Sequence, residues 1–305
     1  MDPDLTELTE LIPLDPRQFI GIPLALIGAV FLSLGAQFQH RGVVKVEALT
    51  ADTLGKGLNG RQLALLLARP SWVLGTLMLG LAIVFQLSSL YFAPLIVVQP
   101  LGALALVITS ILNSRLNHVK LSRKSVVAII MCVGGVFVFV GVAAFTAVSK
   151  PVTDGQIVTI LVILGVVLTA AAITFGLLRH RIRALFYVIM AGVIYGFVAT
   201  LAKVVLNRVQ QGEFEWLTFL CVLALLAGTG LGAYFVQNAY ASGPPDLVIA
   251  GLTVVDPMVA VLIGVIVLGE ASQAPLWAIF VFIVTGAIAV WGVFRLAKNH
   301  PQTRL

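Results

Sequence analysis

The stretch LTVVDPMVAVLIGVIVLG, residues 252–269, belongs to an apolar run that carries one acid, Asp256, directly before one proline, Pro257. A bilayer core of about 30 Å requires about 20 apolar residues of helix. An ionised Asp at the centre of such a helix costs roughly 2.5–3.5 kcal/mol. We therefore interpret the stretch as a membrane helix whose acid has a functional reason to be there.

The composition of the whole chain agrees with this interpretation. Its 305 residues are 60% hydrophobic and 10% charged, with a mean hydropathy of +1.07. A soluble domain carries about 25% charged residues, so this chain could not cover its surface in water. The composition predicts an all-α polytopic membrane protein, in which the net charge of +6 indicates topology rather than a nucleic-acid partner.

Nine apolar segments are long enough to cross the bilayer. They cover residues 19–39, 71–92, 94–113, 125–147, 156–178, 184–206, 216–240, 246–268 and 276–297. The loop 40–70 also ends in a short apolar run, and for segment 59–70 an interfacial and a re-entrant helix both stay open.

The basic residues predict the orientation in the cell membrane, because loops rich in Lys and Arg stay in the cytoplasm. Fifteen of the nineteen Lys and Arg residues fall in loops or tails on one side of the membrane, three on the other side and one within a segment. This places residues 1–18 as an extracytoplasmic tail and residues 298–305 as a cytoplasmic tail. The substrate would then cross from one compartment to the other through the helical part of the chain.

Two segments resemble each other across the chain. VVQPLGALALVITSILN (residues 97–113) and VVDPMVAVLIGVIVLGE (residues 254–270) share a Val-Val-polar-Pro core at an offset of 157. We divide the chain into a first repeat (19–147), a linker helix (148–183) and a second repeat (184–297). Four spans plus one linker invert the second copy, and inverted repeats with broken helices are typical of secondary transporters.

The repeat also predicts where the site lies. Pro100 and Pro257 are the predicted helix breaks, because each proline removes a backbone donor. Gln99 and Asp256 precede them and would face a shared centre that binds substrate or ion. Polar contact between helices is the structural alternative for both.

Two more residues complete the predicted site, because the first and sixth spans align with Gln39 opposite Lys203. Lys203 is either a partner of Asp256, a ligand for an anionic group, or a side chain that reaches the outer interface. Gln39 either lines the route or holds two helices together. Glu270, at the outer end of its span, is interpreted as a solvated cap.

The motifs of enzymes are not found in the sequence. It has no HExxH, CxxC, P-loop or GxSxG pattern, and its four histidines lie outside the spans. We therefore predict no enzymatic activity, no cofactor and no ATP-binding domain, and the sequence leaves the metal ligands unknown. A gradient of an ion or solute would drive transport, and the chain could pair with a second copy of itself.

Three quoted stretches carry a family resemblance. YFAPLIVVQPLGALALVITSILNSRL (91–116) and VFLSLGAQFQHRG (30–42) resemble the corresponding segments of NIPA-type magnesium transporters. AYASGPPDLVIAGLTVVDPMVAVLIGVIVLGE (239–270) is similar to EamA-type members of the drug/metabolite transporter superfamily, whose late helix ends in Gly-Glu. The resemblance implies an inverted-repeat transporter of that superfamily.

Three functions remain open on the sequence. The first is a secondary transporter of the drug/metabolite type that moves a small polar solute by alternating access. The alternative is a NIPA-like transporter of magnesium or another divalent cation, since Mg²⁺ keeps several waters and often needs only one or two carboxylates. The third is a membrane scaffold that transports nothing.

Overall fold

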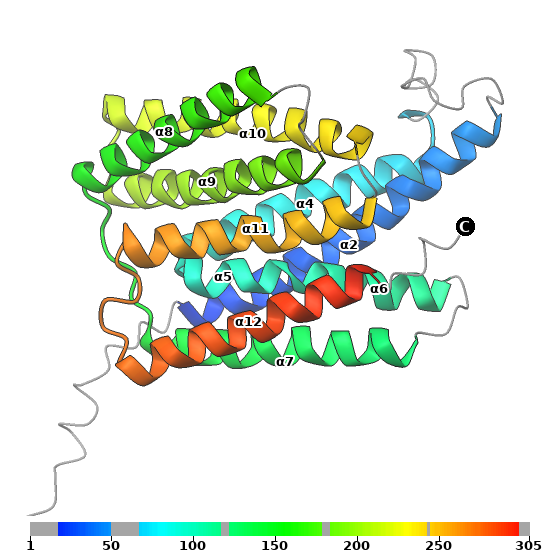
Figure 1. Ribbon diagram of the computed structural model, residues 1–305, viewed down its shortest axis with the longest axis horizontal. Coiled ribbons are helices and arrows are strands. Elements are labelled where there is room, and N and C mark those ends of the chain that lie inside the picture. Colours follow the sequence, from blue (N-terminus) through cyan, green and yellow to red (C-terminus); the bar gives the residue numbers. More distant parts are fainter. Residues whose placement is uncertain (1–17, 50–66, 117–121, 179–183, 243–244, 299–305) are drawn as a thin grey trace, which may run out of the picture.

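The structure is a computed structural model that describes residues 18–49, 67–116, 122–178, 184–242 and 245–298. In these ranges the regular secondary structure is entirely helical (Figure 1). The helices are α2 (Gln18–Leu49), α4 (Pro70–Phe92), α5 (Leu95–Gly102), α6 (Leu104–Leu116), α7 (Arg123–Thr146), α8 (Asp154–Leu178), α9 (Ala184–Gln211), α10 (Trp216–Ser242), α11 (Pro245–Ile266) and α12 (Leu276–Lys298).

Nine stretches of the described residues are long and apolar enough to cross a membrane, so the predicted number of spans is confirmed. Helices α5 and α6 together form the third, Leu95–Arg115. The helix predicted in segment 59–70 lies mostly outside the described residues. So do the predicted tails, apart from one residue at the inner end of each.

Local sequence explains where several helices begin and end. Helix α4 begins with Pro70, whose missing N–H is not needed in a first turn, and it ends where Ala93 and Pro94 adopt extended backbone. Helix α7 begins after Ser122, whose hydroxyl accepts a hydrogen bond from the Ser125 N–H. We call residues 90–96, which run from the end of α4 through Ala93 and Pro94 to the start of α5, the corner.

The two prolines of the repeat behave differently. Pro100 lies in the last turn of α5, and the third span is interrupted around Ala103 before α6 begins. Pro257 lies inside α11, which continues through it without interruption. Of the two predicted helix breaks, only Pro100 is therefore next to an interruption, because the neighbours of α11 hold its backbone helical across the missing hydrogen bond.

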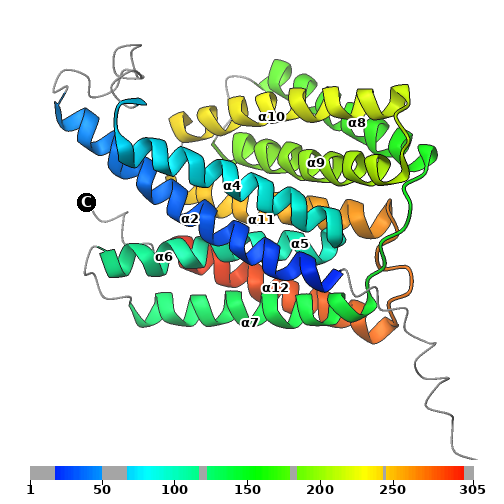
Figure 2. The same cartoon turned by 180° about the vertical axis from the view of Figure 1, so that it is seen from behind.

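The helices pack in antiparallel pairs, as the front and back views show (Figures 1 and 2). Helix α2 packs along α4, α9 along α10, and α7 along α12, while α11 lies between α9 and α5. Helix α8 lies at one edge, next to α9 and α10. The first turns of α5 are the centre of the core, since Leu95, Ile96, Val97 and Val98 are all buried.

The outward faces of the bundle are apolar. Leu77, Phe137 and Phe280 are among many large hydrophobic side chains that are mostly exposed. In water such a surface would favour aggregation, whereas in a bilayer it contacts the apolar lipid tails. The chain is therefore a multi-pass membrane protein. We call the end of the bundle that holds the corner and the turn after α11 the corner end; it lies on the left in Figure 1.

Candidate functional site: the interface of α5 and α11

The third spans of the two predicted repeats meet at the interface of α5 and α11. A Cβ added at Gly264, near the end of α11, would lie 3.2 Å from the Leu95 Cβ at the start of α5. The end of one helix therefore lies beside the start of the other, and the two run antiparallel. Residues four apart share a helix face, so Leu95 and Gln99 lie on one stripe of α5, whereas Asp256, eight residues before Gly264, is rotated about 80° from it around α11.

This register gives the relative level of two of the predicted site residues along the helix axis. From the Leu95–Gly264 contact, Gln99 lies four residues along α5 and Asp256 eight residues back along α11. At 1.5 Å per residue, their levels along the helix axis differ by about 6 Å. Gln99 and Asp256 thus differ in level by about one helical turn, and the shared centre that the repeat predicts stays a prediction.

Both residues have a buried polar atom without a hydrogen-bond partner in the described part of the chain. These atoms are the Gln99 Nε2 and the Asp256 Oδ1. Gln99 is only 5% exposed. A buried donor or acceptor left unpaired costs about 1–3 kcal/mol, so such atoms are retained where something else supplies the partner.

Helix α9 supports α11 from the other side. Gly192 and Gly196 lie so close to α11 that added Cβ atoms would be 2.6 Å from the Val255 Cβ and 2.7 Å from the Val259 Cβ. The GxxxG spacing thus allows the two backbones to touch. Tyr195, between these glycines, is near enough for an electrostatic interaction with Asp256. Tyr195 is not among the residues predicted from the sequence, where its place between the two glycines was the available signal.

A small apolar cavity of about 100 Å³ lies beside this interface, between α5, α7, α11 and α12. Pro100 and Pro257 both line it, together with apolar side chains such as Phe139 and Met258. Neither Gln99 nor Asp256 is among its lining residues, because each lies on a different face of its helix from the proline that follows it. An apolar cavity offers water or an ion no partner, so the polar site is separate from this space.

Lys203 is buried, only 4% exposed, and its ammonium donates to two backbone carbonyl oxygens of the corner. The Nζ lies 2.7 Å from the Leu90 O and 2.9 Å from the Ala93 O. Lys203 is seven residues along α9 from Gly196, which touches the Asp256 backbone, and seven residues span about 10 Å. The ammonium is thus engaged at the last turn of α4, a level different from that of Asp256.

Gln39 contacts a neighbouring helix rather than the α5–α11 interface. Its Nε2 donates to the Thr76 Oγ1 on α4 at 3.0 Å. The approach of α2 and α4 is close there, since a Cβ added at Gly75 would lie 2.6 Å from the Gln39 N. This contact matches the structural alternative, in which the amide holds two helices together.

The expectation that Glu270 is a solvated cap is wrong. Glu270 is 2% exposed, and its carboxylate accepts hydrogen bonds from the Leu95 N–H (2.8 Å) and the Ile96 N–H (2.9 Å). It therefore caps α5, a helix 174 residues earlier in the chain. Burial raises the pKa of Glu270, while Lys203 and the two backbone donors act to lower it. The sequence showed the Gly-Glu and Phe-Ala-Pro motifs separately, and only folding brings them together.

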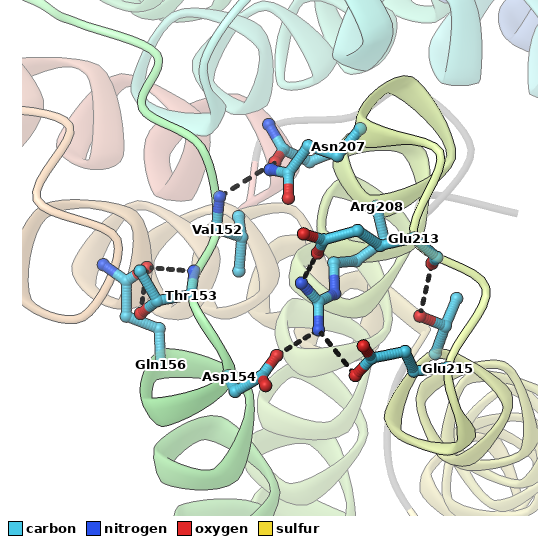
Figure 3. A network of polar contacts seen from close by, with 10 residues as sticks. Val152, Thr153, Asp154, Gln156, Asn207, Arg208, Glu213 and Glu215 are labelled. Carbon is cyan, nitrogen blue, oxygen red and sulfur yellow. Dashed lines mark hydrogen bonds and ion pairs between the residues drawn. The ribbon is translucent and has the colours of Figure 1, made fainter.

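A second polar network lies at the corner end, where α8 begins and α9 ends (Figure 3). Buried Arg208 pairs with Asp154 and Glu213, and its Nη2 lies 4.0 Å from the Glu215 Oε2. Asn207, next to it, accepts a hydrogen bond from the Val152 N–H at 2.9 Å (Figure 3). From the sequence, Arg208 was predicted only as a basic residue of the outer side.

These features define a class of protein. A polytopic helical bundle with an unpaired carboxylate oxygen and amide nitrogen at a central helix interface has the architecture of a membrane transporter, because intramembrane ionisable groups mark substrate and ion pathways. The sequence model of the magnesium transporter NIPA family matches residues 17–205, and the chain belongs to that family. The resemblance of residues 30–42 and 91–116 to NIPA transporters is thereby confirmed.

A relative covers nearly the whole chain. An uncharacterized protein of Corynebacterium glutamicum is 26% identical over 292 residues, which are 93% of this chain and 96% of that protein. No solved structure matches the chain. The family is one of transporters rather than enzymes.

Proposed function

We propose that this protein carries Mg²⁺ across the membrane by alternating access, with Asp256 as the carboxylate that the ion meets inside the bundle. The observation that carries the proposal is the buried Asp256 Oδ1, which has no hydrogen-bond partner among the described residues. Membership of the NIPA family supports Mg²⁺ as the ion.

One carboxylate suits an ion that must be released again. Mg²⁺ dehydrates reluctantly, keeps several waters, and is commonly bound through one or two carboxylates. Among the described residues, no group of three or more His, Cys, Asp and Glu side chains could hold a metal ion. We therefore expect Asp256 to accept hydrogen bonds from the water shell of the ion, and the Gln99 amide to orient that shell.

The position of Lys203 favours a cation over a polar organic solute. The organic-solute hypothesis depended on a zwitterion-like centre formed by Asp256 and Lys203. The Lys203 ammonium instead donates to the Leu90 and Ala93 carbonyl oxygens, about 10 Å along α9 from the level of Asp256. A negative centre without that ammonium attracts a cation.

The packing also supports two inverted four-helix units related by an axis through the site. The first two helices of each unit pair with each other, as α2 with α4 and α9 with α10. The third helices, α5 and α11, meet each other, and so do the fourth helices, α7 and α12. An axis that relates the units brings such equivalent helices together, and it makes Gln99 the counterpart of Asp256. In this proposal the corner end is extracytoplasmic, as the distribution of Lys and Arg predicts.

Mg²⁺ entry into sealed proteoliposomes that contain a trapped Mg²⁺ dye tests the proposal. We expect entry above that of empty liposomes, and a loss of at least about tenfold in Asp256→Asn, because a hydrogen bond to a charged group contributes about 1.5–3 kcal/mol. Glu215→Gln is the matched control, since it removes an exposed carboxylate at the corner end.

Three results would contradict the proposal. If Mg²⁺ enters no faster than into empty liposomes, and the protein is shown to be folded, Mg²⁺ transport is ruled out. The scaffold and organic-solute hypotheses would then be the ones to test. Entry that is undiminished in Asp256→Asn would remove Asp256 from the pathway. An equal loss in Glu215→Gln would show that the flux depends on charge at the corner end rather than on the intramembrane carboxylate.

A further inference from the structure

The corner brings together two helix ends that both need capping. The last carbonyl groups of α4 and the first N–H groups of α5 have no partners within their own helices. Extended backbone at Ala93 and Pro94 separates the two helices, so neither can supply the groups that the other needs. The residues that carry the relevant groups are buried, so water does not supply the partners either: at most 2% is exposed of Leu90, Ala93, Leu95 and Ile96.

Two charged side chains of the second half of the chain cap these ends. The Lys203 ammonium donates to the Leu90 and Ala93 carbonyl oxygens, and the Glu270 carboxylate accepts from the Leu95 and Ile96 N–H groups. The signs suit the helix dipoles, since a cation is favourable at a helix C-terminus and an anion at an N-terminus. Lys203 and Glu270 also attract each other.

The backbone around Glu270 is shaped to place its carboxylate there. Gly269 adopts a positive φ of 69°, which turns the chain back towards the corner. A Cβ added at Gly264 would lie 2.7 Å from the Glu270 Oε2, so only glycine leaves room for the carboxylate. The Glu270 backbone is held as well, because its O accepts from the Val148 N–H at 2.8 Å and its N–H donates to the Gly264 O at 3.0 Å.

The two caps and the corner come from different halves of the chain. We propose that Glu270 and Lys203 form a gate at the corner end, which holds the corner against α9 and α11 in the closed state and releases it when the bundle opens at that end. Opening there moves the corner away from the second half, and it must break all four of these hydrogen bonds.

Such a gate is reversible because both of its charges are buried. Removing a charged group from water carries a desolvation penalty, and hydrogen bonds and attraction to the opposite charge offset it in the closed state. When the corner leaves, water reaches the ammonium and the carboxylate and replaces the lost backbone partners. The open and closed states are therefore closer in free energy than four broken hydrogen bonds would suggest.

The distance between the two halves of the chain at the corner end shows directly whether the gate is open or closed. Spin labels at Tyr91→Cys, in the last turn of α4, and Gln273→Cys, after α11, lie at exposed positions on either side of the gate. Cys132 and Cys221, which are buried, are changed to Ala in this background. Pulsed electron paramagnetic resonance in lipid nanodiscs then gives the distance distribution between the labels.

We expect one dominant short distance in the parent protein and a second, longer population in Glu270→Gln. The amide keeps the size of the side chain but offers one acceptor instead of two, so its NH₂ faces a backbone donor. Gly264→Ala, which displaces the carboxylate without removing its charge, should have the same effect. Gly230→Ala is the matched control, because an added Cβ there meets nothing within 4 Å.

The outcomes separate the gate from the proposed function. A longer population in Glu270→Gln and Gly264→Ala, and not in Gly230→Ala, supports the gate. If a folded Glu270→Gln or Gly264→Ala variant shows only the distance distribution of the parent protein, the gate is contradicted. The measurement needs no substrate, so absence of Mg²⁺ flux together with the longer population would contradict the proposed function and leave the gate standing.

Discussion

Replacement of Gly196 by Ala tests the contact that holds α11, and with it Asp256, against α9. A Cβ at this position would lie 2.7 Å from the Val259 Cβ and 2.9 Å from the Asp256 O. Ordinary contact begins at 3.4 Å, so α11 must move by about 0.5–0.7 Å. Neither atom can rotate away, because one is a Cβ and the other belongs to the backbone.

The expected change in the free energy of unfolding follows from two opposing effects. Overpacking costs about 1–3 kcal/mol, while the change from Gly to Ala inside a helix gains up to about 1 kcal/mol. Gly230→Ala in α10 shows only the gain, since it meets nothing within 4 Å. We therefore expect the free energy of unfolding of Gly196→Ala to lie about 1–3 kcal/mol below that of Gly230→Ala.

Equilibrium unfolding of the two variants in mixed micelles, with increasing fractions of dodecyl sulfate, measures this difference. The parent protein provides the reference for the helix-propensity gain. Equal stability of Gly196→Ala and Gly230→Ala, within about 0.5 kcal/mol, would refute the close approach of α9 and α11. It would also remove the argument that these glycines position Asp256.

Two further predictions concern buried groups at other helix interfaces. Ser89→Ala should lower the free energy of unfolding by about 1 kcal/mol, because the buried hydroxyl donates to the Gly21 O of α2 at 2.7 Å. Ser88→Ala is the control: its hydroxyl bonds only its own helix, so the same unfolding assay should show little change. Cys132 and Cys221 should not react with a maleimide until the protein is unfolded, since both are buried; fast labelling of either thiol in the native protein would contradict the packing around it.

Part of the candidate site was predictable from local pattern. The Val-Val-polar-Pro core at an offset of 157 singled out Gln99 and Asp256, which lie on the neighbouring helices α5 and α11. Their burial and unpaired atoms are consistent with the predicted shared centre, which stays a prediction until flux is measured. The same pattern predicted a helix break at Pro257, where α11 instead runs on because its neighbours hold it.

The sequence by itself determined the membrane class, the nine spans and their approximate limits, because these follow from the length of apolar runs and the thickness of a bilayer. Only the tertiary structure decided what the charged residues do. Lys203 was predicted to pair with Asp256, bind an anionic group or reach the outer interface, and Glu270 to be a solvated cap. Both instead cap helix ends at the corner. Their partners are backbone groups more than a hundred residues away, and the side chains along the chain carry no signal of where such groups will lie.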